Sequence, residues 1–222
     1  MARPTRSPCC PVGGPKPTTD ERTRNAVELT ENARLTTPET AVLHSLRVKG
    51  RATESALATA TGLSEVDISG ALREGLGSGW YTQRTGRLAG WLLTPSGRDR
   101  WSELNAAERA AIDLGALSEV YDNEFLALNR EFKDLCTRWQ LAADASGLDR
   151  IDEALTRLLA LFAAQLPRFA RYRSRFSAAL RRFTEGEEKA LLQPLTDSYH
   201  DIWLELHEDL LLLLDKQRDP DD

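Results

Sequence analysis

The sequence predicts a mainly helical protein in which three short helices and a β-hairpin precede an antiparallel bundle of long helices. Residues 37–79 hold three apolar stretches, each opened by Thr or Ser and closed by Gly. Residues 80–85 alternate aromatic and polar side chains, and residues 88–93 return as a second apolar run after Gly86. Beyond residue 101, apolar side chains recur at spacings of three and four, which is typical of helices that bury one face.

Length and composition indicate a globular protein of one or two domains. The 222 residues are 41% hydrophobic and 28% charged, with a net charge of −5 at pH 7. No apolar run is long enough to span a bilayer, and the N-terminus lacks the apolar segment of a secretory signal. Three cysteines do not make a disulfide framework. We therefore expect a cytoplasmic protein that makes no membrane contact.

Composition also divides the chain into three parts. Residues 1–19 hold five prolines and no periodicity, which predicts a disordered tail. The tail includes a Cys9-Cys10 pair, which either senses redox state or is incidental. Residues 20–101 form the second part and begin with a short predicted helix at 20–35. Residues 102–222 carry fifteen basic and twenty-four acidic side chains, whereas residues 37–101 carry eight and six, so the two halves favour different partners.

Three helices are predicted between residues 37 and 79. Thr37 can cap the first, which has Pro38 in its first turn and ends at Gly50. The second spans residues 53–61 and is closed by Gly62. Ser64 can cap the third, with Asp67 as a capping-box-like partner. Their expected apolar core consists of Val42, Leu43, Leu46, Leu57, Leu63, Ile68 and Leu72.

The order helix, helix, helix, hairpin, helix is that of a winged helix-turn-helix. The stretch "ESALATATGLSEVDISGALREGLGSGWY" and the closing "LTPSGR" resemble the winged helix-turn-helix transcriptional regulators, in particular the MarR type and more loosely the PadR type. The resemblance covers about residues 38–101. It implies a double-stranded DNA partner, with the third helix in the major groove and the hairpin tip on the backbone or minor groove. A dimer that matches a two-fold symmetric operator is also implied.

The expected DNA contacts lie on the third helix, on the hairpin tip and beside the first helix. They are Arg47, Lys49, Arg51, Ser64, Asp67, Ser69, Gly70, Arg73, Arg84, Thr85 and Arg87. The third helix departs from most recognition helices because Glu65, Asp67 and Glu74 outnumber Arg73. A winged helix that contacts protein instead of DNA is therefore the alternative. No catalytic or cofactor motif is present, so we expect neither an enzyme nor a cofactor, although a helical enzyme of unfamiliar type stays open.

Four apolar stripes mark the predicted bundle, at residues 114–139, 148–166, 169–183 and 192–213. Pro194 is expected near the first turns of the last helix or as a kink. The stripes fit a bundle core, a dimer contact, or both. We interpret residues 102–222 as a dimerisation and effector domain.

Three features of this half invite functional interpretation. Residues 168–183 hold six arginines and no acid, and either bind an anion or pair with the acidic last helix. Asp197 and His200 have the spacing of metal-binding bundles, but no second such pair appears, so we expect no metal. Tyr121, Phe125, Asn129, Phe132 and Trp139 make an aromatic face that either lines a pocket for a small-molecule effector or is a packed helix face with polar edges. A partner protein is the other signal to which this half could respond.

Overall fold

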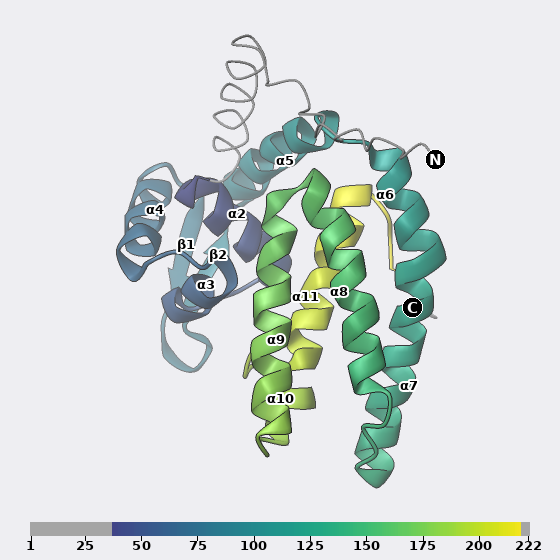
Figure 1. Cartoon of the computed structure of the whole chain (residues 1–222). Coiled ribbons are helices and arrows are strands. Elements are labelled where there is room, and N and C mark those ends of the chain that lie inside the picture. Colours follow the sequence, from purple (N-terminus) through teal and green to yellow (C-terminus); the bar gives the residue numbers. More distant parts are fainter. Residues whose placement is uncertain (1–36, 219–222) are drawn as a thin grey trace, which may run out of the picture. The chain divides into compact units, whose positions relative to one another are not determined.

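The computed structural model describes residues 37–218. The predicted tail at 1–19, its cysteine pair and the predicted helix at 20–35 lie outside the described residues. The described residues belong to one compact unit that is mainly helical and contains a small antiparallel sheet, as Figure 1 shows. No helix between residues 37 and 218 combines the length and the apolar character needed to cross a membrane.

The first half has the element order that the sequence predicts. Its elements are α2 (Pro38–Lys49), α3 (Glu54–Thr61), α4 (Glu65–Gly77), β1 (Tyr81–Arg84), β2 (Gly90–Leu93) and α5 (Pro95–Ala110). Thr37 and Ser64 cap α2 and α4 as predicted, each accepting a backbone N–H three residues on at 3.2 Å. Thr53 and Thr94 cap α3 and α5 in the same way.

The sheet is extended by a residue between α2 and α3. Strands β1 and β2 pair with Tyr81 opposite Leu93 and Gln83 opposite Trp91. Ala52 bridges to the other edge of β2 through two backbone hydrogen bonds with Trp91, of 3.1 and 2.8 Å. Gly90 has a φ of 146°, and a Cβ there would lie 3.0 Å from the Ala52 carbonyl oxygen. Glycine is therefore needed where the two segments meet.

A compact apolar core holds α2, α3, α4 and the hairpin together. Six of its seven predicted members are buried, and Leu63 is half-buried. Trp101 of α5 belongs to the same core, and α5 continues through the predicted domain boundary at residues 101–102 without a linker. Further along α5, Asn105 Nδ2 donates to the Leu212 carbonyl at 3.4 Å. The two halves are therefore joined by a helix that contacts both.

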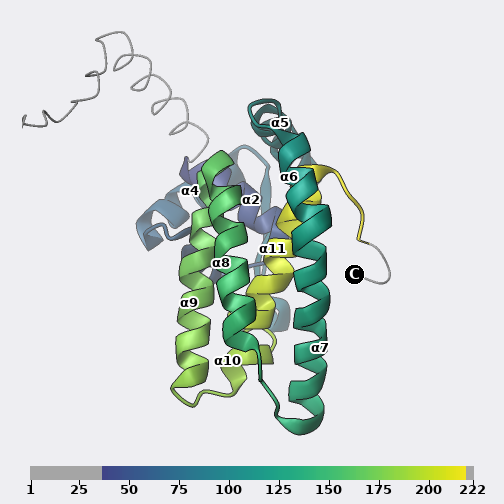
Figure 2. The same ribbon diagram turned by 45° about the vertical axis from the view of Figure 1, so that its right-hand side comes forward.

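The second half is built from α6 (Leu114–Val120), a π-helical turn (Tyr121–Phe125), α7 (Leu126–Ala142), α8 (Leu148–Gln165), a 3₁₀ turn (Pro167–Phe169), α9 (Ala170–Thr184), α10 (Lys189–Leu192) and α11 (Tyr199–Leu214). Figures 1 and 2 both show α7, α8, α9 and α11 running alongside one another. Most apolar residues of the predicted stripes are buried within this one chain, including Leu206 and Leu213, whereas Leu195 is exposed. The stripes therefore form the bundle core. A dimer stays a prediction and would need another surface.

The prediction of one last helix from Leu192 is wrong. Helix α10 ends at Leu192, and α11 begins only at Tyr199. Pro194 lies in the intervening segment because proline cannot donate the backbone hydrogen bond that a continuous helix needs. Leu195 and Asp197 in this segment have φ values of 63° and 53°, which are uncommon for residues other than glycine.

Candidate nucleic-acid interface and an adjoining cavity

The outward face of α4 is the first candidate surface. Ile68, Ala71, Leu72 and Gly75 are its buried residues. At 3.6 residues per turn, the side directly opposite carries Val66, Gly70, Arg73 and Gly77. The carboxylates of Glu65, Asp67 and Glu74 flank this stripe and do not lie on it. The net negative charge of α4 therefore lies beside the outward stripe and not on it.

The glycines of α4 differ in what surrounds them. A Cβ on Gly75 would lie 2.1 Å from Cε2 of Tyr81, so packing against the hairpin requires glycine there. A Cβ on Gly70 or Gly77 would meet nothing within 4 Å, and neither residue has a positive φ. Packing within the chain therefore does not explain Gly70 and Gly77. A small outward surface does permit another molecule to approach the helix backbone closely.

The polar residues predicted on α4 have local partners. Ser64 donates its hydroxyl to Asp67 Oδ2 at 2.6 Å, so both residues serve the start of the helix. Ser69 donates to Glu54 Oε2 at 2.8 Å and is half-buried against α3. Arg73 is exposed, and its Nε donates to the Ser69 carbonyl at 3.2 Å. Arg73 keeps its terminal guanidinium nitrogens toward solvent.

The hairpin turn carries the second group of predicted contacts. Arg84, Thr85 and Arg87 are all exposed, and Gly86 between them has a φ of 80°. Within residues 37–218, neither arginine forms an ion pair. The turn therefore presents two cations to solvent on the same segment, as the sequence predicts.

The structure separates Arg47 and Lys49 from these two groups. Lys49 Nζ contacts Glu205 Oε1, and Arg47 Nη1 lies 3.6 Å from Glu208 Oε1, so both side chains face α11. Arg47 also lies over the Trp101 ring, 5.1 Å from its centroid. Arg51 is exposed and donates to the Ala89 carbonyl at 3.1 Å. Of the three cations predicted beside α2, only Arg51 has no carboxylate partner among the described residues.

A buried carboxylate, Asp209 of α11, joins α2 to the bundle. Arg168 Nη2 donates to Asp209 Oδ1 at 2.9 Å, and the Tyr172 hydroxyl donates to Oδ2 at 3.0 Å. His44 Nε2 of α2 lies 3.0 Å from the same Oδ2, although the contact falls short of an aligned hydrogen bond. Burial raises the pKa of Asp209, but Arg168 and His44 outweigh burial and hold that pKa well below its ordinary value.

Three of the six arginines in the stretch 168–183 form ion pairs within residues 37–218, and two of these, Arg168 and Arg175, pair with the acidic last helix as one of the two predicted roles requires. Arg168 binds Asp209 and contacts Glu108 of α5. Arg175, which is buried, donates to Glu205 at 2.6 Å and contacts Asp197. These arginines hold the bundle to α5 and to the start of α11, and they are not available to an external anion.

The aromatic residues predicted to line an effector pocket come together but pack on one another. Phe125 and Phe132 stack against Trp203 with centroid distances of 5.8 and 4.2 Å. Asn129 accepts from Trp203 Nε1 at 2.8 Å, and the Tyr121 hydroxyl contacts His207 Nε2 at 2.9 Å. Trp139, the fifth predicted residue, is half-buried with its ring edge-on to Phe183. This face is core.

The predicted pairing of Asp197 with His200 has no helical geometry. Asp197 precedes α11 and is bound to Arg175. Burial lowers the pKa of His200, which lies half-buried on α11. No group of three His, Cys, Asp or Glu side chains that could hold a metal occurs in the part of the chain that the structure describes.

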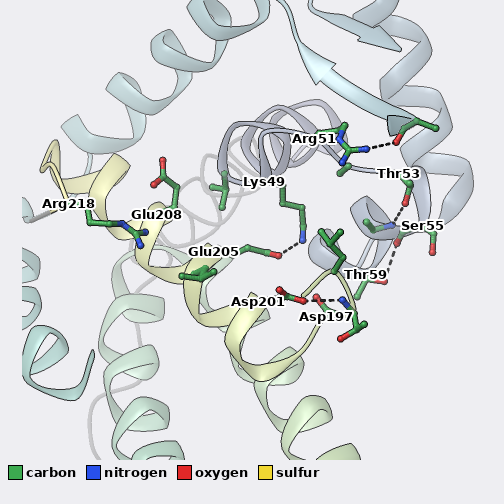
Figure 3. A pocket seen from close by; sticks show the side chains of 17 residues that line it. Lys49, Arg51, Thr53, Ser55, Thr59, Asp197, Asp201, Glu205, Glu208 and Arg218 are labelled. Carbon is green, nitrogen blue, oxygen red and sulfur yellow. Dashed lines mark hydrogen bonds and ion pairs between the residues drawn. The ribbon is translucent and has the colours of Figure 1, made fainter. Parts of the chain in front are cut away.

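A cavity of about 780 Å³ lies where the segment around α3 faces α11 (Figure 3). One wall comes from the end of α2, the start of α3 and Ala89, and the other from the 195–197 segment and α11. Its charged lining residues are Lys49, Arg51, Asp197, Asp201, Glu205, Glu208 and Arg218. No pattern in the sequence predicts this cavity, because its walls come from segments far apart in the chain.

We find no match between the chain and known family models, curated proteins or solved structures.

Proposed function

We propose that the protein is a sequence-specific DNA-binding transcriptional regulator and that residues 38–93 are a winged helix-turn-helix. Helix α4 would lie in the major groove, and the β1–β2 turn would contact the backbone or minor groove. The observation that carries the proposal is the outward stripe of α4, in which Arg73 lies between two glycines that packing does not require.

The surrounding architecture supports this role. Helices α3 and α4 are joined by a short turn in which Gly62 is left-handed and Ser64 caps the next helix. Ala52 completes a small sheet with the hairpin, which fixes the hairpin relative to α3. A recognition helix and a projecting turn would in this way be held on one core.

The phosphate contacts of the proposal are fewer than the sequence predicts. Arg51, Arg73, Arg84 and Arg87 are exposed and have no carboxylate partner within residues 37–218, whereas Arg47 and Lys49 are engaged by α11. A two-fold symmetric dimer would bring about eight such arginines to DNA. Loss of affinity on the order of 10³–10⁵ would follow between roughly 50 and 200 mM salt.

The bundle would make DNA binding respond to a ligand or a partner protein. Helix α11 is bound to α2 through His44, Arg47 and Lys49, so a change at the bundle can reach the DNA-binding half. A ligand or partner protein would shift DNA binding only if it binds the DNA-competent and DNA-incompetent states with different affinity. A DNA-binding regulator must share a compartment with the DNA, and the cytoplasm is the location that we expect.

A protein-contact function is the second candidate. Val66 is 78% exposed and Leu76 49% exposed on α4, and Val66 lies between Glu65 and Asp67 in the sequence. Exposed apolar side chains beside carboxylates suit a basic protein partner at least as well as a polyanion.

Fluorescence anisotropy of a pool of genomic DNA duplexes separates the two candidates. The DNA-binding proposal predicts saturable binding at about 50 mM salt that weakens steeply by about 200 mM. Absence of DNA binding at the lower salt concentration would contradict the proposal. In that case Val66→Asp and Leu76→Asp would be the variants with which to test capture of a protein partner.

A further inference from the structure

The cavity between α3 and α11 has a second wall made of carboxylates, and each of them is already engaged. Glu205 contacts Lys49 through Oε1 and Arg175 through Oε2. Asp197 contacts Arg175, and Glu208 lies 3.6 Å from Arg47. Asp201 accepts the backbone N–H groups of Thr196 and Ser198 at 3.0 and 3.3 Å. A cationic ligand would have to displace these partners.

Unlike the carboxylates, two of the cations in the lining have no partner of opposite charge within residues 37–218. Arg51 meets only a backbone carbonyl, and Arg218 has no ion pair within residues 37–218. Figure 3 places these two arginines on opposite sides of the Lys49–Glu205 pair. The lining holds three cations and four carboxylates, but Arg47 and Arg175 from outside the lining pair with three of those carboxylates, so Arg51 and Arg218 are the lining cations left without a carboxylate partner among residues 37–218.

The start of α3 contributes a positive potential of its own. Thr53, Ser55 and Ala56 line the cavity at the N-terminal turn of the helix, where the helix dipole favours an anion. Glu54 in the same turn does not line the cavity. Its carboxylate accepts instead from Ser69 and from Trp91 Nε1, at 2.8 and 3.3 Å.

Beside the polar Thr59 and Thr196, the remaining lining is apolar and includes two exposed leucines. Leu195 is 92% exposed, although its φ of 63° is a costly conformation for leucine, and Leu204 beside it on α11 is 41% exposed. Val48, Ala56 and Ala89 face them from the other wall. A strained backbone that presents an uncovered leucine at a cavity is the arrangement expected where a ligand supplies the missing contact.

We propose that this cavity binds an organic anion with an apolar body. Arg51 and the start of α3 hold its anionic group, and Leu195 and Leu204 cover its body. The ligand would contact both α3, which precedes α4, and α11, which binds α2. Its role as a regulator of DNA binding rests on the proposed function. Binding itself does not depend on DNA.

The test uses 8-anilinonaphthalene-1-sulfonate, an aromatic anion whose fluorescence rises in apolar sites, titrated into the full chain without DNA. We expect saturable binding that Arg51→Glu weakens by about tenfold or more, because a charge-assisted contact becomes a repulsion. The matched control is Arg73→Glu, which reverses an exposed arginine on α4 and should change the dissociation constant by less than about twofold.

Leu195→Asn provides a variant whose fold is not at risk. Asparagine tolerates a positive φ better than leucine, so the variant should unfold at the same temperature as the wild type or a higher one. It should nevertheless bind the probe more weakly. Absence of saturable binding, binding unchanged by Arg51→Glu and Leu195→Asn, or equally effective competition by 1-naphthylmethylammonium would each overturn the proposal. None of these results bears on DNA binding, which is measured separately.

Discussion

His44 Nε2 on α2 lies 3.0 Å from Asp209 Oδ2 on α11, and this contact connects the three-helix segment to the bundle at a carboxylate that is 1% exposed. Trp101 Nε1 of α5 donates to His44 Nδ1 at 3.3 Å. Because an indole nitrogen can only donate, Nδ1 accepts, and Nε2 is the ring nitrogen that faces Asp209. Three helices therefore meet through one histidine.

Asp209→Asn should destabilise the protein strongly. The substitution keeps the shape of the side chain but leaves Arg168 buried with one carboxylate partner fewer. Breaking a buried ion pair from one side costs about 3–5 kcal/mol. Asp215→Asn is the control, because the Arg109–Asp215 pair is exposed at Asp215 and should contribute less than about 1 kcal/mol. Urea unfolding measures both, and equal midpoints for the two variants would contradict the role given to Asp209.

The contribution of Asp209 should depend on pH in one direction. The pKa of Asp209 is lower in the folded state than in the unfolded chain, so the unfolded chain binds the proton more tightly. The stabilisation is therefore complete above the ordinary aspartate pKa of about 4 and is lost as the pH falls below it. Unfolding of the wild type and Asp209→Asn between pH 7 and pH 3 should show converging stabilities. A difference that stays constant to pH 3 would show that the carboxylate does not act through its charge.

The same substitution at two glycines of α4 should have opposite effects on stability. Gly70→Ala should stabilise by about 0.5–1 kcal/mol, because the helix gains an alanine in open space. Gly75→Ala should destabilise by about 1–3 kcal/mol, because its Cβ meets the Tyr81 ring. Thermal or urea unfolding checks both signs. If Gly70→Ala destabilises the protein, then packing within the chain does require glycine at position 70. In that case Gly70 no longer supports the approach of DNA to α4.

Arginines of the hairpin and Lys49 should differ in their effect on DNA binding. Arg84→Ala and Arg87→Ala should each reduce affinity for all sequences and lower the slope of log affinity against log salt by about 1.8, because the proposed dimer loses two phosphate contacts, each worth about 0.9. Lys49→Gln should leave that slope unchanged, because its amine contacts Glu205. A lower slope for Lys49→Gln, with the fold intact by circular dichroism, would restore Lys49 as a phosphate contact.

Local signals in the sequence predicted most of the helices and their ends. Thr37 and Ser64 are caps, and Gly62 is the left-handed C-cap of α3, because such features depend on residues within one turn of the chain. Pro194 was placed within a helix that in fact ends before it. A proline alone does not say whether a helix is kinked or broken, since that depends on the packing around it.

The candidate sites were less predictable because they depend on distant partners. Lys49 looked available for phosphate, but its partner Glu205 lies 156 residues further along the chain. Phe125 and Phe132 were correctly placed on one face, yet periodicity could not show that Trp203 fills the space beside it. The cavity is lined mainly by segments between helices and by α11, and no periodic pattern brings Arg51 and Leu195 together.

If the outward stripe of α4 enters the major groove, then selection from genomic fragments by the wild type and by Gly70→Leu in parallel should give different results. Leucine at position 70 projects into open space, so the variant should fold while its side chain blocks the approach of DNA. Ala116→Leu, at an exposed position of α6, is the control. We expect the wild type and the control to enrich one two-fold symmetric sequence and Gly70→Leu to enrich none. Failure of the wild type to enrich any sequence, or enrichment of the same sequence by Gly70→Leu, would contradict the account.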